Sequence, residues 1–145
     1  MSAKDQLREF FSIWMETDAL YSQFAKASGI TGTTFWILYC IRQSEENITQ
    51  TDISQQWSIP KQTLNSSLRE LAKKNLITLT ELESDRRSKL VALTEEGKLF
   101  SEKHVDPICK IEEAAFERMS DSEREAMLGG VKKFLEMLKL EARNE

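Results

Sequence analysis

Proline, glycine, cysteine and histidine are all scarce in this chain of 145 residues, which holds two, five, two and one of them. Few glycines and prolines leave long stretches free to form helices, and 40% hydrophobic with 30% charged side chains is typical of ordered globular proteins. No apolar run approaches the roughly 18 residues of a membrane-spanning helix. The opening MSAKDQLREFF also lacks the apolar stretch of a secretion signal. We therefore expect one structural domain, rich in helix, in the cytoplasm.

The single histidine, His104, excludes most catalytic and metal-binding arrangements. The sequence has no second histidine for a catalytic triad, no nucleophile elbow, no glycine-rich phosphate loop and no metal motif. A metal sensor would need several nitrogen or sulfur ligands close together. We predict no enzymatic activity, no metal and no cofactor, and we expect His104 on the surface of a long helix.

Two cysteines, Cys40 and Cys109, are too few and too far apart to form a disulfide framework. Each lies among apolar residues, in ILYCI and PICKI, which favours buried structural thiols. The alternative is a pair of redox-sensing thiols. That role requires a lowered thiol pKa, and the only supporting charge is Lys110 beside Cys109.

The net charge of −4 conceals one positive segment. Residues 61–91 hold seven basic and four acidic side chains, whereas 1–60 and 95–145 are both net negative. A polyanion should therefore dock on the middle segment.

Apolar residues recur at helical spacing near both ends of the chain. The first stripe predicts a helix that runs to about Ala27 and ends at Gly29. The stretch TTFWILYCIRQ is apolar nearly all round and predicts a second helix in the core. Ser120 and Glu123 form a capping box ahead of the last helix. The two terminal stripes comprise Leu7, Phe10, Phe11, Trp14 and Tyr21, and Met127, Leu128, Val131, Phe134, Leu135 and Leu138.

The stretch ITQTDISQQWSIPKQTLNSSLRELAKKNLI predicts two short helices joined by a tight turn. Thr49 can cap the first helix, with Asp52 in the position of a capping-box acid. Ile53 and Trp57, four residues apart, are expected to face inward. This is the pattern of a helix-turn-helix.

The second of these helices, at about 60–74, carries the predicted recognition surface. Pro60 suits its opening turn, Asn75 its left-handed end, and a leucine stripe at 64, 68 and 71 its buried side. Glutamine and asparagine can pair with adenine, arginine with guanine and threonine with the thymine methyl group, while lysines reach phosphates. The alternative is an ordinary solvated helix face. The outward residues are Lys61, Gln62, Thr63, Asn65, Ser66, Arg69 and Lys73.

A β-hairpin at about 76–93 follows, because LITLTELE and SKLVALT alternate like strands around a polar tip. An arginine at this tip can reach the minor groove beside a helix in the major groove. Asp85 can hold Arg87 in one pose, and Arg86 or Lys89 can serve the flanking phosphates. Beyond the hairpin, Thr94 caps a long helix that Pro107 should kink.

The resulting fold is mainly α with some β: a winged helix-turn-helix with a two-stranded β-wing, plus terminal helices that form a dimerisation region. We assign residues 1–30 to an N-terminal dimerisation helix, 31–94 to the DNA-binding region, and 95–145 to the long helix and a C-terminal dimerisation helix. The terminal apolar stripes need a partner, and a winged helix that reads one short half-site binds weakly, so two copies are expected. The alternative is that the stripes pack only within one monomer.

The helix-turn-helix, the wing ESDRRSKLVALTEEGKLF and the late MSDSEREAML together resemble the multiple-antibiotic-resistance-regulator (MarR) family, from about Gly32 to Leu138. The D-x-R-S wing signature of the family falls on Asp85, Arg87 and Ser88, which adds Ser88 to the DNA-binding residues. Its L-T-x-x-G signature falls on 93, 94 and 97. Two positions depart from the family pattern: Asn75 replaces a common glycine, and Pro60 replaces a capping serine or aspartate.

The resemblance implies a sequence-specific transcriptional regulator. We expect a homodimeric repressor of a pseudo-palindromic operator on double-stranded DNA, released by a small aromatic or lipophilic effector or by an oxidant. Trp14, Tyr21, Trp36 and Tyr39 could line an effector pocket between the first two helices, although aromatic residues at this spacing are more often core. The alternative function is a ligand- or protein-binding winged helix without specific DNA binding.

Overall fold

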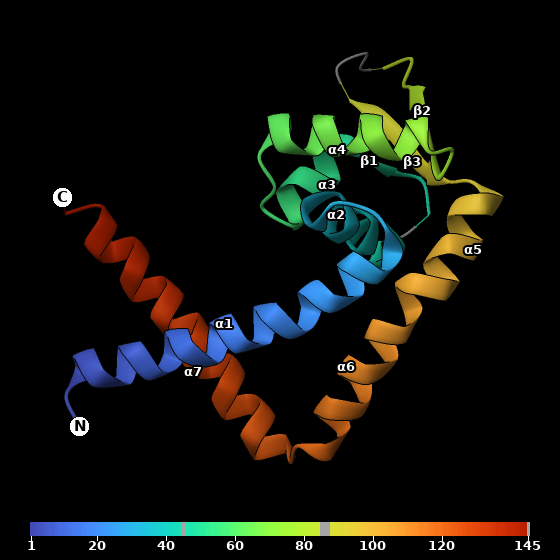
Figure 1. Cartoon of the computed structure of the whole chain (residues 1–145). Coiled ribbons are helices and arrows are strands. Elements are labelled where there is room, and N and C mark those ends of the chain that lie inside the picture. Colours follow the sequence, from blue (N-terminus) through green and yellow to red (C-terminus); the bar gives the residue numbers. More distant parts are fainter. Residues whose placement is uncertain (45, 85–87, 145) are drawn as a thin grey trace. The chain divides into compact units, whose positions relative to one another are not determined.

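The structure is a computed structural model that describes residues 1–44, 46–84 and 88–144. Helices dominate the described chain, and one small antiparallel sheet lies beside them (Figure 1). None of the described helices is long and apolar enough to cross a membrane. In chain order the elements are α1 (Ala3–Ser28), α2 (Gly32–Gln43), β1 (Ile48–Thr49), α3 (Gln50–Gln56), α4 (Lys61–Lys73), β2 (Ile77–Glu81), β3 (Lys89–Leu93), α5 (Glu95–His104), α6 (Asp106–Arg118) and α7 (Asp121–Ala142).

The chain forms two compact units, residues 1–108 and 109–145. The first unit contains the helix-turn-helix, the sheet, α1, α2 and α5, and the boundary falls within α6. All the functional residues predicted for DNA contact belong to the first unit.

The core of the first unit surrounds α2, as its nearly continuous apolar sequence predicted. Phe35 and Leu38 are fully buried, and α2 packs against α1, α4 and α5. Burial of such side chains contributes roughly 1.5–3 kcal/mol each to folding. The recognition helix, α4, therefore packs against α2, the most buried helix of the unit.

The first helix of the helix-turn-helix, α3, begins as predicted. Thr49 accepts a hydrogen bond from the amide of Asp52 at 3.1 Å, and the Asp52 carboxylate accepts one from the amide of Thr49. Ile53 is buried, but Trp57 is 36% exposed, so the prediction that it faces inward was wrong. Trp57 follows the last helical residue of α3, where the chain turns through a left-handed residue, Ser58, and its side chain leaves the buried stripe.

The sheet has three strands in the order β1-β3-β2, one more than the predicted hairpin. β2 and β3 form that hairpin, with Leu79 opposite Val91. β1 pairs with the other edge of β3, where Ile48 lies opposite Val91. The sequence did not predict β1, because a strand of two residues is too short to show an alternating pattern.

The predicted long helix after the hairpin is two helices. α5 ends at His104, Val105 interrupts it, and α6 begins at Asp106 with Pro107 in its first turn. Proline lacks the amide hydrogen and clashes with the preceding turn, but it fits the start of a new helix. His104 is partly exposed and packs against Phe100, with ring centroids 4.6 Å apart, and the partial burial lowers its pKa.

The second unit is the rest of α6 followed by α7. The predicted capping box is present: the amide of Ser120 donates to Glu123 at 2.8 Å, and the Ser120 hydroxyl accepts from the amide of Glu123. The hydrogen bonds that the Ser120 amide and hydroxyl donate to the Glu123 carboxylate lower the pKa of that carboxyl. The apolar side chains along α7, including Leu128, Val131 and Leu135, are exposed in the single chain.

Candidate nucleic-acid interface

Recognition helix α4 has two chemically distinct sides. Leu64, Leu68 and Leu71 are at most 1% exposed and anchor the helix. On the opposite side, every residue of α4 that the sequence predicted to contact DNA is exposed. Its residues are Lys61, Gln62, Thr63, Asn65, Ser66, Arg69 and Lys73.

The only carboxylate on α4, that of Glu70, is turned away from this exposed side. The Thr34 hydroxyl on α2 donates to Glu70 at 2.7 Å, and the Thr34 and Ser67 hydroxyls lie 3.2 Å apart. Glu70 is half-buried as a result. The outward surface of α4 therefore carries cationic and neutral hydrogen-bonding groups and no acid of its own, which suits a polyanion.

The carboxyl end of α4 is fixed by a close backbone contact with α5. Asn75 adopts the predicted left-handed conformation, with φ of 59°. The Thr94 hydroxyl donates to the carbonyl of Asn75 at 2.6 Å and accepts from the amide of Gly97 at 2.9 Å. A Cβ atom on Gly97 would lie 1.9 Å from the carbonyl oxygen of Leu76. The L-T-x-x-G signature thus joins the recognition helix to the start of α5.

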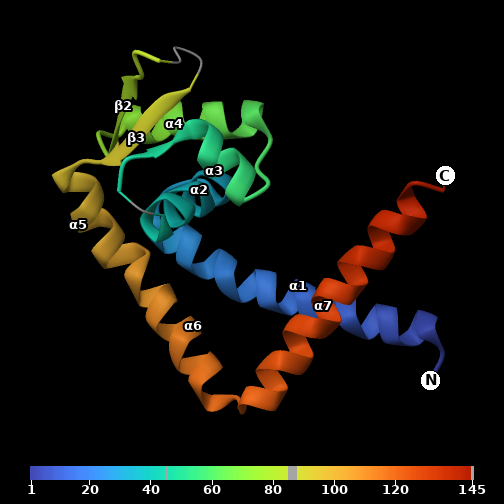
Figure 2. The same ribbon diagram turned by 180° about the vertical axis from the view of Figure 1, so that it is seen from behind.

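The hairpin of β2 and β3 lies beside α4 (Figures 1 and 2). Asp85, Arg86 and Arg87, predicted at its tip, lie outside the described residues. Lys89 begins β3, opposite Glu81, and is half-buried.

Ser88 differs from the other predicted DNA contacts because it is buried, with only 5% of its surface exposed. Its hydroxyl accepts from the Thr51 hydroxyl at 2.8 Å and from the Thr51 amide at 3.3 Å. Ser88 therefore ties the returning strand of the wing to the first turn of α3 and faces inward rather than toward a ligand. The sequence could not reveal this role for Thr51, which is 37 residues away.

The four aromatic residues predicted to form a pocket are distributed over α1 and α2. Tyr21 and Tyr39 each meet Trp36 edge to face, with centroids 5.2 Å apart in both pairs. Trp14 is 59% exposed on α1. An open apolar recess of about 300 Å³ there is lined by Phe10, Ile13, Trp14, Thr17, Asp18 and Tyr21, all from α1.

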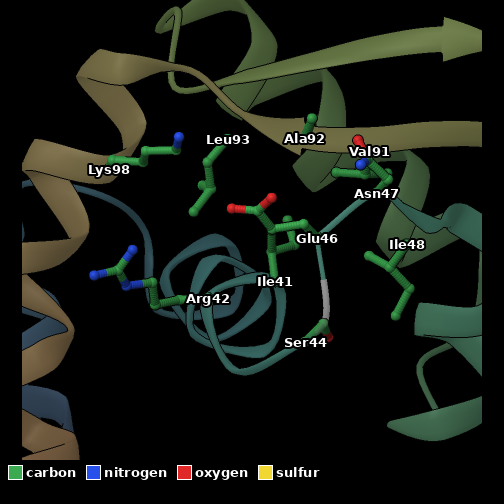
Figure 3. A pocket seen from close by; sticks show the side chains of 10 residues that line it. All are labelled: Ile41, Arg42, Ser44, Glu46, Asn47, Ile48, Val91, Ala92, Leu93 and Lys98. Carbon is green, nitrogen blue, oxygen red and sulfur yellow. The ribbon is translucent and has the colours of Figure 1, made fainter.

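A larger cavity of about 410 Å³, which the sequence did not indicate, lies between α2, the segment before β1, β3 and α5 (Figure 3). In its wall, Arg42 binds Asp106 through two hydrogen bonds, of 2.9 and 2.8 Å. Its other lining residues are Ile41, Ser44, Glu46, Asn47, Ile48, Val91, Ala92, Leu93 and Lys98. Five of the ten lining residues are apolar and five are polar or charged.

Cys40 is buried on α2, and burial raises the pKa of its thiol from 9.0 to about 11. A redox-sensing thiol requires the opposite shift. Cys109 is half-buried in α6. No group of three or more potential metal-ligating side chains occurs within the described ranges.

At neutral pH, a thiol reagent should modify Cys40 only when the protein unfolds, because the thiol is buried and neutral. The unfolded thiol ionises near its usual pKa of 9.0 and the folded one near 11, so the stability that the neutral thiol confers is lost as pH rises between these values. Urea titrations of the wild type and Cys40→Ala across this range will measure it. Equal pH dependence in both proteins, or rapid labelling of folded Cys40, would contradict the expectation.

The helices α3 and α4, the hairpin beside them and the short strand β1 define a winged helix-turn-helix protein of the kind that binds DNA. The sequence pattern of the MarR family matches residues 28–88. In sequence and in fold the chain is similar to the MarR family of DNA-binding transcriptional regulators, the family that its sequence motifs resemble.

Individual relatives agree with this assignment. The HTH-type transcriptional regulator SarZ of Staphylococcus aureus is 28% identical over 106 residues, which cover 73% of this chain and 68% of SarZ. A MarR family regulator from Neisseria meningitidis has a similar structure, with a TM-score of 0.77, 26% identity and 100% of both chains covered. A MepR variant of Staphylococcus aureus, bound to an oligodeoxyribonucleotide, shares the fold with a TM-score of 0.53, 24% identity and coverage of 95% of this chain and 99% of that one.

Proposed function

We propose that this protein is a cytoplasmic, homodimeric repressor that binds a pseudo-palindromic operator and is released by a small effector. The observation that carries the proposal is the exposed side of α4, cationic and rich in amide and hydroxyl groups, opposite a fully buried leucine stripe. Helix α4 enters the major groove, where these groups meet base edges and phosphates. The tip of the wing, with Asp85, Arg86 and Arg87, reaches the adjacent minor groove.

Homodimerisation explains the exposed apolar side chains of both units. In the first unit, Phe11, Trp14 and Leu20 on α1 are half or more exposed. In the second, the apolar stripe of α7 is exposed along its length. Apolar surface of this extent is typical of protein interfaces. Two-fold symmetry would present two copies of α4 to two half-sites.

Selection of bound sequences from random duplex DNA tests the proposal. We expect enrichment of an inverted repeat whose half-sites lie about one helical turn, or roughly 10 base pairs, apart. Binding should weaken steeply with rising salt, because each phosphate contact releases counterions. Sedimentation of the free protein should return a dimer. Absence of any enriched sequence at low salt would instead support a ligand- or protein-binding winged helix.

Replacement of Arg87 by alanine should weaken operator binding more than replacement of Lys73. Arg87 is the predicted minor-groove contact, whose loss costs roughly 1–3 kcal/mol if it reads a base edge. Lys73, exposed at the end of α4, supplies one phosphate contact that salt screens. Fluorescence anisotropy with labelled operator measures both variants, and equal, small losses would contradict the role of the wing.

The cavity beside β3 is the proposed effector site. Ile41, Ile48 and Val91 form its apolar part and Arg42, Glu46 and Lys98 its charged part, which suits an aromatic molecule with a charged group. Strand β3 is also one of the two strands of the wing. Because an occupant presses on the root of the wing, it shifts the hairpin relative to α4. Filling the cavity with Leu93→Trp, at a side chain that points into it (Figure 3), should abolish effector release while the operator still binds, which titration of aromatic acids into the operator complex will measure. Unchanged release by an active acid would place the effector elsewhere.

A further inference from the structure

One of the outward residues of α4 has its chemistry set by a side chain from another helix. Gln50, the first residue of α3, donates a hydrogen bond from its amide Nε2 to Oδ1 of Asn65. Gln50 is half-buried, whereas Asn65 is exposed. The two residues are 15 positions apart in the sequence, and the contact between α3 and α4 brings them together.

The backbone of Gln50 is held in place by the capping box of α3. Thr49 on one side of Gln50 exchanges hydrogen bonds with Asp52, and Thr51 on the other side binds Ser88 through its amide and hydroxyl. Gln50 therefore starts from a fixed position in the first turn of α3. The side chain of Gln50 therefore reaches Asn65 from a defined point of the backbone.

The amide of asparagine presents different chemistry on its two sides. Its oxygen accepts hydrogen bonds, whereas its nitrogen donates two, and the group is planar. Since Oδ1 of Asn65 is bound by Gln50, the Nδ2 group lies on the other arm of the amide. Oδ1 keeps a second lone pair, but because the amide is planar, an oxygen turned toward Gln50 does not face the same base edge as Nδ2. The pair thus favours a base that offers acceptors over a base that also requires an acceptor from asparagine.

We propose that Gln50 is a specificity-determining residue, which acts by orienting the Asn65 amide so that it reads guanine rather than adenine. In the major groove guanine offers two acceptors, N7 and O6, whereas adenine offers the acceptor N7 and the donor N6. An unrestrained asparagine pairs with both adenine groups at once. The inference rests on the proposed function, because it requires α4 to lie in the major groove.

Selection from random duplex DNA with the full-length wild type and Asn65→Ala first identifies the base pair that Asn65 reads. We expect guanine at this position for the wild type and no preference for Asn65→Ala. With Gln50→Ala, the preference at the same position should change toward adenine. The relative enrichment of the two bases should change on the order of 10-fold, the usual discrimination of a paired contact.

Gln50→Glu provides a sharper test, because a carboxylate only accepts hydrogen bonds. It should reverse the Asn65 amide, so that Nδ2 donates to the introduced carboxylate and Oδ1 faces the base. Preference should then move to adenine or cytosine, which offer donors at N6 and N4. The added negative charge will also lower affinity at every sequence, so the readout is base preference and not affinity.

Two controls separate this role from a loss of structure. Gln55→Ala, on an exposed position of α3, should leave the base preference at the Asn65 position unchanged. The double variant Gln50→Ala with Asn65→Ala should select the same bases as Asn65→Ala alone. Thermal unfolding of each variant shows whether it is folded at the temperature of the selection.

The outcomes distinguish this inference from the proposed function. If the wild type enriches no sequence, the proposed function fails and the inference fails with it. If the wild type enriches an operator but prefers adenine at the Asn65 position, or if both Gln50 variants keep the wild-type preference there, only the inference is overturned.

Discussion

Replacement of Leu68 by alanine should lower the free energy of unfolding by about 2–5 kcal/mol, the usual loss for a large-to-small change in a core. Leu68 lies in the middle of the buried stripe of α4 and is 1% exposed. The substitution removes apolar contacts and leaves a cavity that the surrounding helices fill only in part. Urea denaturation followed by circular dichroism, at one fixed protein concentration, measures the change.

Ser66→Ala is the matched control for Leu68→Ala. Ser66 lies on the exposed side of the same helix, and its hydroxyl bonds back to the carbonyl of Gln62 at 3.1 Å. Its replacement should change stability by less than about 0.5 kcal/mol. Equal effects at both positions would contradict the assignment of buried and exposed sides to α4.

Gly97→Ala should destabilise the protein by roughly 1–3 kcal/mol, as overpacking does in other cores. The new Cβ would lie 1.9 Å from the carbonyl oxygen of Leu76 and 2.8 Å from its carbonyl carbon. Both are backbone atoms, so relief requires movement of the chain between α4 and β2 or of α5 itself. Because this segment fixes the end of the recognition helix, operator affinity should fall at temperatures where the variant is still folded.

Gly32→Ala provides the comparison for Gly97→Ala. A Cβ at Gly32, the first residue of α2, meets no atom within 4 Å. This change should leave the free energy of unfolding unaltered or raise it by about 0.4–1 kcal/mol, since alanine restricts the unfolded chain. Denaturation curves and anisotropy titrations of both variants supply the measurements. A Gly97→Ala protein as stable as Gly32→Ala would show that the backbone contact with Leu76 does not constrain this position.

The local features of the fold could be predicted because neighbouring residues specify them. Thr49, Thr94 and Ser120 cap helices as expected, since a helix amide three residues on needs an acceptor. Asn75 takes the left-handed conformation at the end of α4. The leucines of α4 are buried because their spacing follows the helical repeat.

Other features could not be predicted because they depend on contacts between distant parts of the chain. β1 is too short to have a pattern and exists only because β3 is available to pair with it. Trp57 has the spacing of a buried residue, but the turn that follows α3 leaves it exposed. Ser88 follows the arginines of the wing, but packing against Thr51 turns it inward. The cavity beside β3 is lined by residues within 41–48 and within 91–98, which are far apart in the sequence.

The sequence by itself determined which side of α4 is apolar, where the helices are capped and which segment is positively charged. These properties follow from residue spacing and side-chain chemistry, which need no partner. Only the tertiary structure decided what the exposed side offers to DNA. Where α2 packs against α4, Thr34 binds the Glu70 carboxylate, 36 residues away, and holds it off the exposed side. Where α3 packs against α4, Gln50 forms a hydrogen bond with Asn65. A hydrogen bond has a range of about 3 Å, so distant residues form one only after folding has brought them together.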